Sequence, residues 1–274
     1  MSDDYLWNRS GRDEDVERLE QLLEPLALQS DVPRPRAGNP GRLAIVAAAA
    51  ALLVAILASV LRPVEPSALP ERIDFPDVGH VRTEPGARGR VIRQSPEQVR
   101  LRLDRGTIHA SIGAHVKPRL FQVETPVTTC VDLGCIYTLT VDAEGRSVVS
   151  VTLGRVAFVD GAREVYIPTG ASCRASRRGS GTPAYDGAAP EFIAAVHAFD
   201  DAPSVERARR VASLARKEDR LTLWHFLQDA AVVEVGCDAL VRLWELPPDV
   251  TREATLRRDP DALAAWKRHL GYTW

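Results

Sequence analysis

The feature that most constrains this chain is an uninterrupted apolar run at residues 43–61, LAIVAAAAALLVAILASVL. The run contains no charged residue and a single serine, and Arg42 and Arg62 bracket it. Spanning a bilayer takes about 20 predominantly apolar residues in a helix. A helix of a water-soluble protein normally keeps one polar face, which this run lacks. A cleaved secretory signal would lie within about the first 15–30 residues. The sequence therefore predicts one uncleaved transmembrane helix.

Basic residues around this run predict its orientation. Cytoplasmic flanks of a membrane helix carry an excess of Lys and Arg. The three arginines before the run exceed the two after it, which places the N-terminal side in the cytoplasm. These residues are Arg34, Arg36 and Arg42 before the run, and Arg62 and Arg72 after it. Residues 63–274 would then occupy an oxidising compartment, where disulfides form.

Periodicity divides the rest of the chain. Apolar and polar residues alternate in short stretches separated by turn signals across residues 78–175, which predicts an all-β unit, whether sandwich, barrel or solenoid. Residues 189–274 return to helical spacing. We expect a multidomain membrane protein with an all-β domain and a C-terminal all-α segment. The expected parts are a helical tail at 1–30, a linker at 31–42, the membrane helix at 43–61, the β-domain at 78–175, a linker at 176–188 and the helical domain at 189–274.

The N-terminal tail predicts an acidic amphipathic helix. Its apolar stripe at helical spacing consists of Val16, Leu19, Leu22, Leu23 and Leu26. One interpretation lays this stripe on the inner membrane leaflet. Interfacial helices usually carry a polar face rich in Lys and Arg, however, whereas this one is acidic. The stripe therefore favours a basic groove on a cytoplasmic protein, in the helix-in-groove mode.

Residues that could carry catalysis or bind metal form no motif. None of the six histidines pairs with a cysteine at zinc-ligand spacing. No serine stands in a nucleophile elbow, and the glycines of 176–188 lack the Gly-Lys-Ser/Thr ending of a phosphate loop. A net charge of −2 gives no pull toward nucleic acid. We expect no enzyme activity, no metal, no cofactor and no direct contact with nucleic acid.

Three of the four cysteines lie in the predicted β-domain. Cys130 and Cys135 flank VDLG, and their opposite parity would point them to opposite sides of a straight strand. Cys173 follows PTG near the end of the domain, where the chain could return beside the strand that starts at Cys135. We expect a Cys135–Cys173 disulfide with Cys130 buried as a small hydrophobe. A Cys130–Cys135 bond is the alternative.

Residues 101–174 carry a pattern of turn residues: F-x-V-x-T-P, then V-x-D-L-G, then V-x-x-G-x-V and a late P-x-G. The more specific positions are Thr125, Pro126, Asp132, Gly134, Gly154 and Gly170. This pattern, over about a quarter of the chain, resembles the FecR domain. That family consists of membrane-bound bacterial regulators, many of which act on extracytoplasmic-function sigma factors.

The resemblance implies a single-pass regulator of the bacterial inner membrane, with a cytoplasmic N-terminus and periplasmic C-terminal domains. It would transmit an envelope signal, received through an envelope protein or ligand at residues 78–274, to a cytoplasmic partner bound by residues 1–30. A sigma factor is the candidate partner. Because family members have a larger N-terminal region and a different distal module, iron-uptake signalling does not carry over. The alternative is an envelope binding or scaffold protein, or an accessory to an envelope enzyme, without a sigma-factor role.

Overall fold

The computed structural model describes residues 67–161 and 163–272. These residues belong to one compact unit, Glu65–Trp274. The predicted N-terminal helix, the linker at 31–42 and the predicted transmembrane segment at 43–61 lie outside them. Within the described part of the chain, no helix combines the length and apolarity needed to cross a bilayer.

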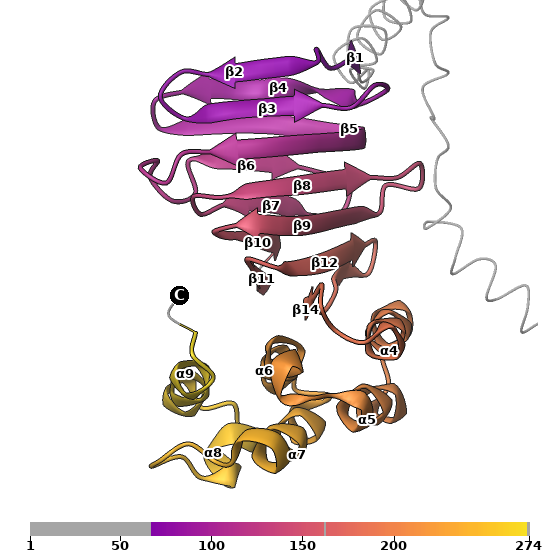
Figure 1. The fold of residues 1–274 in the computed structure, drawn as a ribbon, viewed down its shortest axis with the longest axis vertical. Coiled ribbons are helices and arrows are strands. Elements are labelled where there is room, and N and C mark those ends of the chain that lie inside the picture. The colour runs from indigo at the N-terminus through magenta and orange to yellow at the C-terminus, as the bar shows by residue number, and fades with distance from the viewer. Residues whose placement is uncertain (1–66, 162, 273–274) are drawn as a thin grey trace, which may run out of the picture. The chain divides into compact units, whose positions relative to one another are not determined.

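Strands come first along the described chain, and helices follow (Figure 1). The strands are β1 Ser67–Ala68, β2 Arg72–Phe75, β3 Gly79–Thr83, β4 Arg88–Ser95, β5 Gln98–Ile112, β6 Phe121–Glu124, β7 Thr129–Asp132, β8 Ile136–Val141, β9 Ser147–Leu153, β10 Arg155–Asp160, β11 Arg163–Pro168, β12 Ala171–Ser176, β13 Gly179–Ser180 and β14 Ala184–Tyr185. The helices are α4 Pro190–Asp201, α5 Val205–Leu214, the 3-10 turn η2 Lys217–Asp219, α6 Arg220–Leu227, α7 Val233–Trp244, α8 Arg252–Leu256 and α9 Pro260–His269. A β-rich domain followed by a helical part confirms the predicted fold class at this level.

The strands form two layers that share β5. The first layer has the order β1-β4-β5-β6-β7-β10-β11, and the second has the order β2-β3-β5-β8-β9-β12, with β13 and β14 beside β12. Strand β5 pairs with β6 in parallel, and the other described pairs are antiparallel. Strands therefore begin at β1 and β2, before the boundary at residue 78 that alternation predicts.

Strand β5 passes from one layer to the other at Gly106. Odd-numbered side chains up to Leu103 are buried in the core, whereas from Ile108 onward the even-numbered ones are. The shift in phase falls where Gly106 has a φ of 100°, a conformation that L side chains rarely adopt. A Cβ at this position would lie 2.5 Å from Ala87 Cα, so the close approach of the neighbouring chain also requires glycine.

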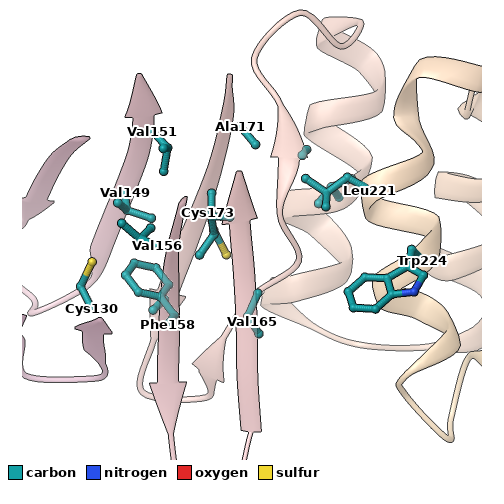
Figure 2. Close-up of a cluster of buried hydrophobic side chains, with 14 of the residues drawn as sticks. Cys130, Val149, Val151, Val156, Phe158, Val165, Ala171, Cys173, Leu221 and Trp224 are labelled. Carbon is teal, nitrogen blue, oxygen red and sulfur yellow. The ribbon is translucent and has the colours of Figure 1, made fainter. Parts of the chain in front are cut away.

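The core continues from the β-domain into the helices. Val165 of β11 and Leu221 and Trp224 of α6 belong to one buried cluster (Figure 2). Thr222 Oγ1 donates to Pro183 O at 2.8 Å. His225 is buried, which lowers its pKa to about 3, and its Nε2 lies 3.2 Å from the backbone oxygen of Tyr166 on edge strand β11. Helix α6 therefore covers that edge of the first layer.

The segment 176–188, which composition predicts to be a linker, is part of this packed unit. It contains β13 and β14, both paired with β12. The Thr182 backbone N–H and hydroxyl both donate to the Asp200 carboxylate of α4, at 3.0 Å and 2.8 Å. Burial raises the pKa of Asp200 to about 6, while these hydrogen bonds oppose the rise. Glycine- and serine-rich composition indicates irregular backbone, but here neighbouring elements satisfy its polar groups.

Candidate functional site: the corner turns of the β-domain

Three turns carry the chain between the two layers at one end of the β-domain. The first joins β7 to β8, the second joins β9 to β10, and the third joins β11 to β12. The turns are hydrogen-bonded in succession: Leu133 N donates to Arg155 O at 3.2 Å, and Thr169 N donates to Gly154 O at 3.0 Å. We call these three turns the corner. Four of the six more specific motif positions lie in it, namely Asp132, Gly134, Gly154 and Gly170.

Asp132 holds the first corner turn together. Its Oδ1 accepts a hydrogen bond from Gly134 N at 2.6 Å, and its Oδ2 accepts one from Cys135 Sγ at 2.5 Å. The side chain is only 2% exposed. Burial raises the pKa of Asp132 to about 6, and the hydrogen bonds from Cys135 and Gly134 partly oppose this rise. The carboxyl group is thus engaged by its own turn, which favours a structural role over a chemical one.

Gly154 packs directly on this first turn. A Cβ at Gly154 would lie 2.2 Å from Gly134 O and 2.9 Å from Cys135 Cβ. Both glycines also have positive φ, 90° for Gly134 and 81° for Gly154. Gly170 has a φ of 73° but no neighbour within 4 Å of a Cβ built there. The two motif segments, distant in sequence, therefore constrain each other in space.

Thr125 and Pro126 lie at the opposite end of the β-domain, in the turn between β6 and β7. Thr125 Oγ1 donates to Thr128 O at 2.9 Å and accepts from Thr128 N at 3.1 Å. Pro126 approaches Gly145 of the β8–β9 turn, where a Cβ would lie 3.1 Å from Pro126 Cβ. The motif positions thus divide into two groups of turn-forming residues and do not converge on one chemical centre.

The predicted Cys135–Cys173 disulfide is wrong, because all four cysteines are free and buried. Ile136, next to Cys135, pairs with Leu153 of β9, whereas Cys173 pairs with Val149, four positions away on that strand (153 − 149). At about 3.3 Å per residue this offset alone is roughly 13 Å, well beyond the 4.4–6.8 Å that a disulfide spans between Cα atoms.

The alternative Cys130–Cys135 bond is also absent. Cys130 is fully buried, as expected, in the core between the layers (Figure 2). Burial raises the pKa of both the Cys130 and the Cys135 thiols, which keeps them protonated and unreactive. The hydrogen bond from Cys135 to Asp132 was not predicted from the sequence. The available signal was an Asp three residues before a Cys, with a glycine between them.

An open depression of about 660 Å³ lies beside the corner. Its wall includes Phe75, His80 and His115 together with Ile136 and Leu153. The last two are apolar side chains with 40% and 59% of their surface exposed. In residues 67–161 and 163–272, no three His, Cys, Asp or Glu side chains are grouped so that they could hold a metal ion. The depression presents an apolar rim that suits binding.

Comparison with known proteins gives limited similarity. No protein-family profile matches the sequence, and no curated protein matches it. Two crystal structures of a "putative anti-sigma factor" from Parabacteroides distasonis ATCC 8503 are similar to part of the chain, at 16% and 15% identity and a TM-score of 0.36 each. The matches cover 45% and 48% of this chain and 58% and 59% of those chains, which is less than two thirds of their length.

Proposed function

We propose that the protein is a single-pass regulator of the bacterial inner membrane with a FecR-type β-domain. In this proposal the N-terminus is cytoplasmic, and the β-domain and helical part are periplasmic. The protein transmits an envelope signal to a cytoplasmic partner, for which a sigma factor is the candidate. The observation that carries the proposal is the contact between Gly154 and the Asp132–Gly134 turn, because two motif segments meet there.

The contact between Gly154 and the Asp132–Gly134 turn supports the resemblance, because it explains physically why glycines stand at these motif positions. A short pattern of glycines can match by chance. Here Gly134 and Gly154 have backbone angles that disfavour other residues, and a side chain at Gly154 would clash with the other turn. The pattern thus consists of residues that a two-layer domain with stacked corner turns requires. In the proposal, this architecture is the one that the FecR-type motif specifies.

A role in binding fits this architecture better than one in catalysis. Asp132 is buried in its own turn, and burial keeps the corner thiol of Cys135 protonated. The accessible feature of the corner is the open depression with exposed Ile136 and Leu153. In the proposal this depression receives the envelope protein or ligand that supplies the signal.

On the cytoplasmic side, the proposal assigns partner capture to the N-terminal helix. Its stripe includes Leu19 and Leu22, and acidic residues dominate its polar face. An isolated helix of this length is marginal in water, so the apolar stripe would gain most from a groove on another protein. A sigma factor binds DNA and so presents basic surface, which complements the acidic face.

Capture of partners by the tagged full-length chain, extracted from membranes in mild detergent, tests the proposal. Leu19→Asp plus Leu22→Asp should abolish recovery of the cytoplasmic partner, because two carboxylates would enter the apolar contact. Arg18→Gln plus Gln21→Asp is the matched control, since it lowers the net charge by the same two units but on the polar face, and it should retain the partner. Both variants should resist extraction from membranes at alkaline pH.

Two results would contradict the proposal. Retention of the cytoplasmic partner by the Leu19 and Leu22 variant would exclude the helix as the capture element. Recovery of envelope proteins alone, equally with both variants, would favour the scaffold or enzyme-accessory alternative.

A further inference from the structure

Six arginines oppose one another in three cross-strand pairs on β4 and β5. We call this set the arginine ladder. Its pairs are Arg88 with Arg105, Arg90 with Arg102, and Arg93 with Arg100. Leu101 and Leu103 between them are buried in the core, so the ladder lies on the outer face of the first layer. Like charges directly opposite each other destabilise a sheet. The ladder therefore needs compensation from elsewhere.

In the described part of the chain, this compensation is found only on β5. Arg100 forms an ion pair with Glu124, and Arg102 lies 2.7 Å from Asp104 and 3.8 Å from Glu124. Among residues 67–161 and 163–272, no carboxylate forms an ion pair with the β4 arginines or with Arg105. Arg88, Arg90, Arg93 and Arg105 therefore have no carboxylate partner in that part of the chain.

One exposed apolar side chain lies beside the arginines on β4. Ile92 is 41% exposed and lies at an irregularity in the β4–β5 register. Val91 pairs with the buried Leu101, so it lies on the opposite face of the sheet from Arg90 and Arg102. Within the described residues, strand β1 pairs only with Arg88 and Gly89 of β4. Arginines beside an exposed isoleucine match the boundary between lipid headgroups and acyl chains, where the apolar group inserts and the guanidinium groups stay at the headgroups.

A short stretch of sequence joins this edge to the predicted membrane helix. Strand β1 starts at Ser67, six peptide steps after residue 61, the end of the apolar run. Six residues span at most about 20–22 Å when fully extended. Ser67 pairs with Gly89, and its hydroxyl donates to Gly89 O at 3.1 Å. Because Gly89 follows Arg88, the sequence joins the start of the arginine ladder to the predicted membrane helix by this short connection.

We propose that the arginine ladder, with Ile92, docks on anionic headgroups of the membrane that holds residues 43–61. The contact compensates the opposed arginines and fixes which face of the β-domain meets the bilayer. This inference rests on the proposed function, because it requires residues 43–61 to be inserted in the membrane.

A fluorescent label at the ladder tests the contact directly. Ile92→Cys can be labelled selectively with an environment-sensitive dye, because the four native cysteines are buried. The labelled full-length chain is reconstituted in vesicles of phosphatidylcholine alone, or of phosphatidylcholine mixed with an equal amount of phosphatidylglycerol. A lipid-borne quencher should quench the dye in the mixed vesicles and much less in the neutral ones. A label at Leu153→Cys, on the rim of the corner depression, should stay unquenched in both.

Charge-removing variants distinguish docking by the arginine ladder from a general attraction between a positively charged surface and anionic lipid. Each basic residue near an anionic surface strengthens the contact by roughly fivefold. Arg90→Gln plus Arg93→Gln should therefore weaken docking by about 25-fold and abolish the quenching, without loss of folding, because it relieves the opposed charges. Arg177→Gln plus Arg178→Gln removes equal charge from the exposed β12–β13 turn and should leave quenching unchanged.

The outcomes distinguish this inference from the function on which it rests. A chain that alkaline extraction releases from the vesicles overturns both. An inserted chain whose Ile92 label is quenched equally in both lipids, or equally with and without Arg90 and Arg93, overturns the ladder alone. A label that is shielded in cell membranes but not in purified vesicles indicates an acidic protein partner and overturns lipid docking.

Discussion

Replacing Gly154 by alanine should destabilise the β-domain by about 2–5 kcal/mol. Adopting a positive φ costs an L-residue roughly 1–2 kcal/mol, and Gly154 has a φ of 81°. The added Cβ would also stand 2.2 Å from Gly134 O, a backbone atom that cannot rotate away. Forcing extra volume into a packed site costs about 1–3 kcal/mol more.

Gly170→Ala is the matched control for this substitution. Gly170 has a similar φ of 73°, but a Cβ there meets nothing within 4 Å. Its expected cost is the conformational term alone, about 1–2 kcal/mol. Urea unfolding of the full-length chain in detergent, followed by circular dichroism, compares the two variants. Equal losses for Gly154→Ala and Gly170→Ala would refute the contact between the corner turns.

The remaining predictions concern ionisation, thiols and the second turn. The folded pKa of Asp132, about 6, exceeds its ordinary value of 3.8. Between these two pH values the folded protein keeps a proton that the unfolded chain releases. The free energy of unfolding should therefore fall by roughly 3 kcal/mol as pH rises from about 4 through 6. Asp132→Asn should remove this part of the pH dependence in urea titrations, whereas an unchanged slope would contradict it. All four cysteines should react with a thiol reagent only after unfolding, and fewer than four in the unfolded, unreduced protein would reveal a disulfide. Thr125→Val removes two hydrogen bonds to Thr128 and should lower the free energy of unfolding by about 1–3 kcal/mol. A urea unfolding midpoint equal to that of the native protein would show that the turn does not need these hydrogen bonds.

Alternation in the sequence predicted those strands that bury one face. Apolar and polar residues alternate at 99–103 and again at 107–112, and both stretches are strand, but they are two halves of β5. Periodicity could not show this continuity, because the phase of burial changes between Leu103 and Ile108. Strand β4 escaped prediction because its sequence, RGRVIRQS, is mostly exposed and polar. An edge strand without an apolar face shows little alternation of apolar and polar residues.

The candidate site was predictable in its residues but not in its geometry. The glycines and Asp132 mark turns in the sequence, yet only the layer order brings Gly154 onto the turn at Gly134. The disulfide failed for the same reason. Placing Cys135 beside Cys173 required the register of β8, β9 and β12, and hydrogen-bonded register depends on contacts between distant residues. The arginine ladder likewise arises from cross-strand pairing.

A topology measurement tests the central claim most directly. Alkaline phosphatase folds to an active form only in the exported compartment, and a fluorescent protein fused at the same position reports the cytoplasm. We predict an active phosphatase and a dark fluorescent protein when each is fused after Trp274 in bacterial cells. An inactive phosphatase together with a bright fluorescent protein would place the C-terminus in the cytoplasm and contradict a regulator with a periplasmic β-domain.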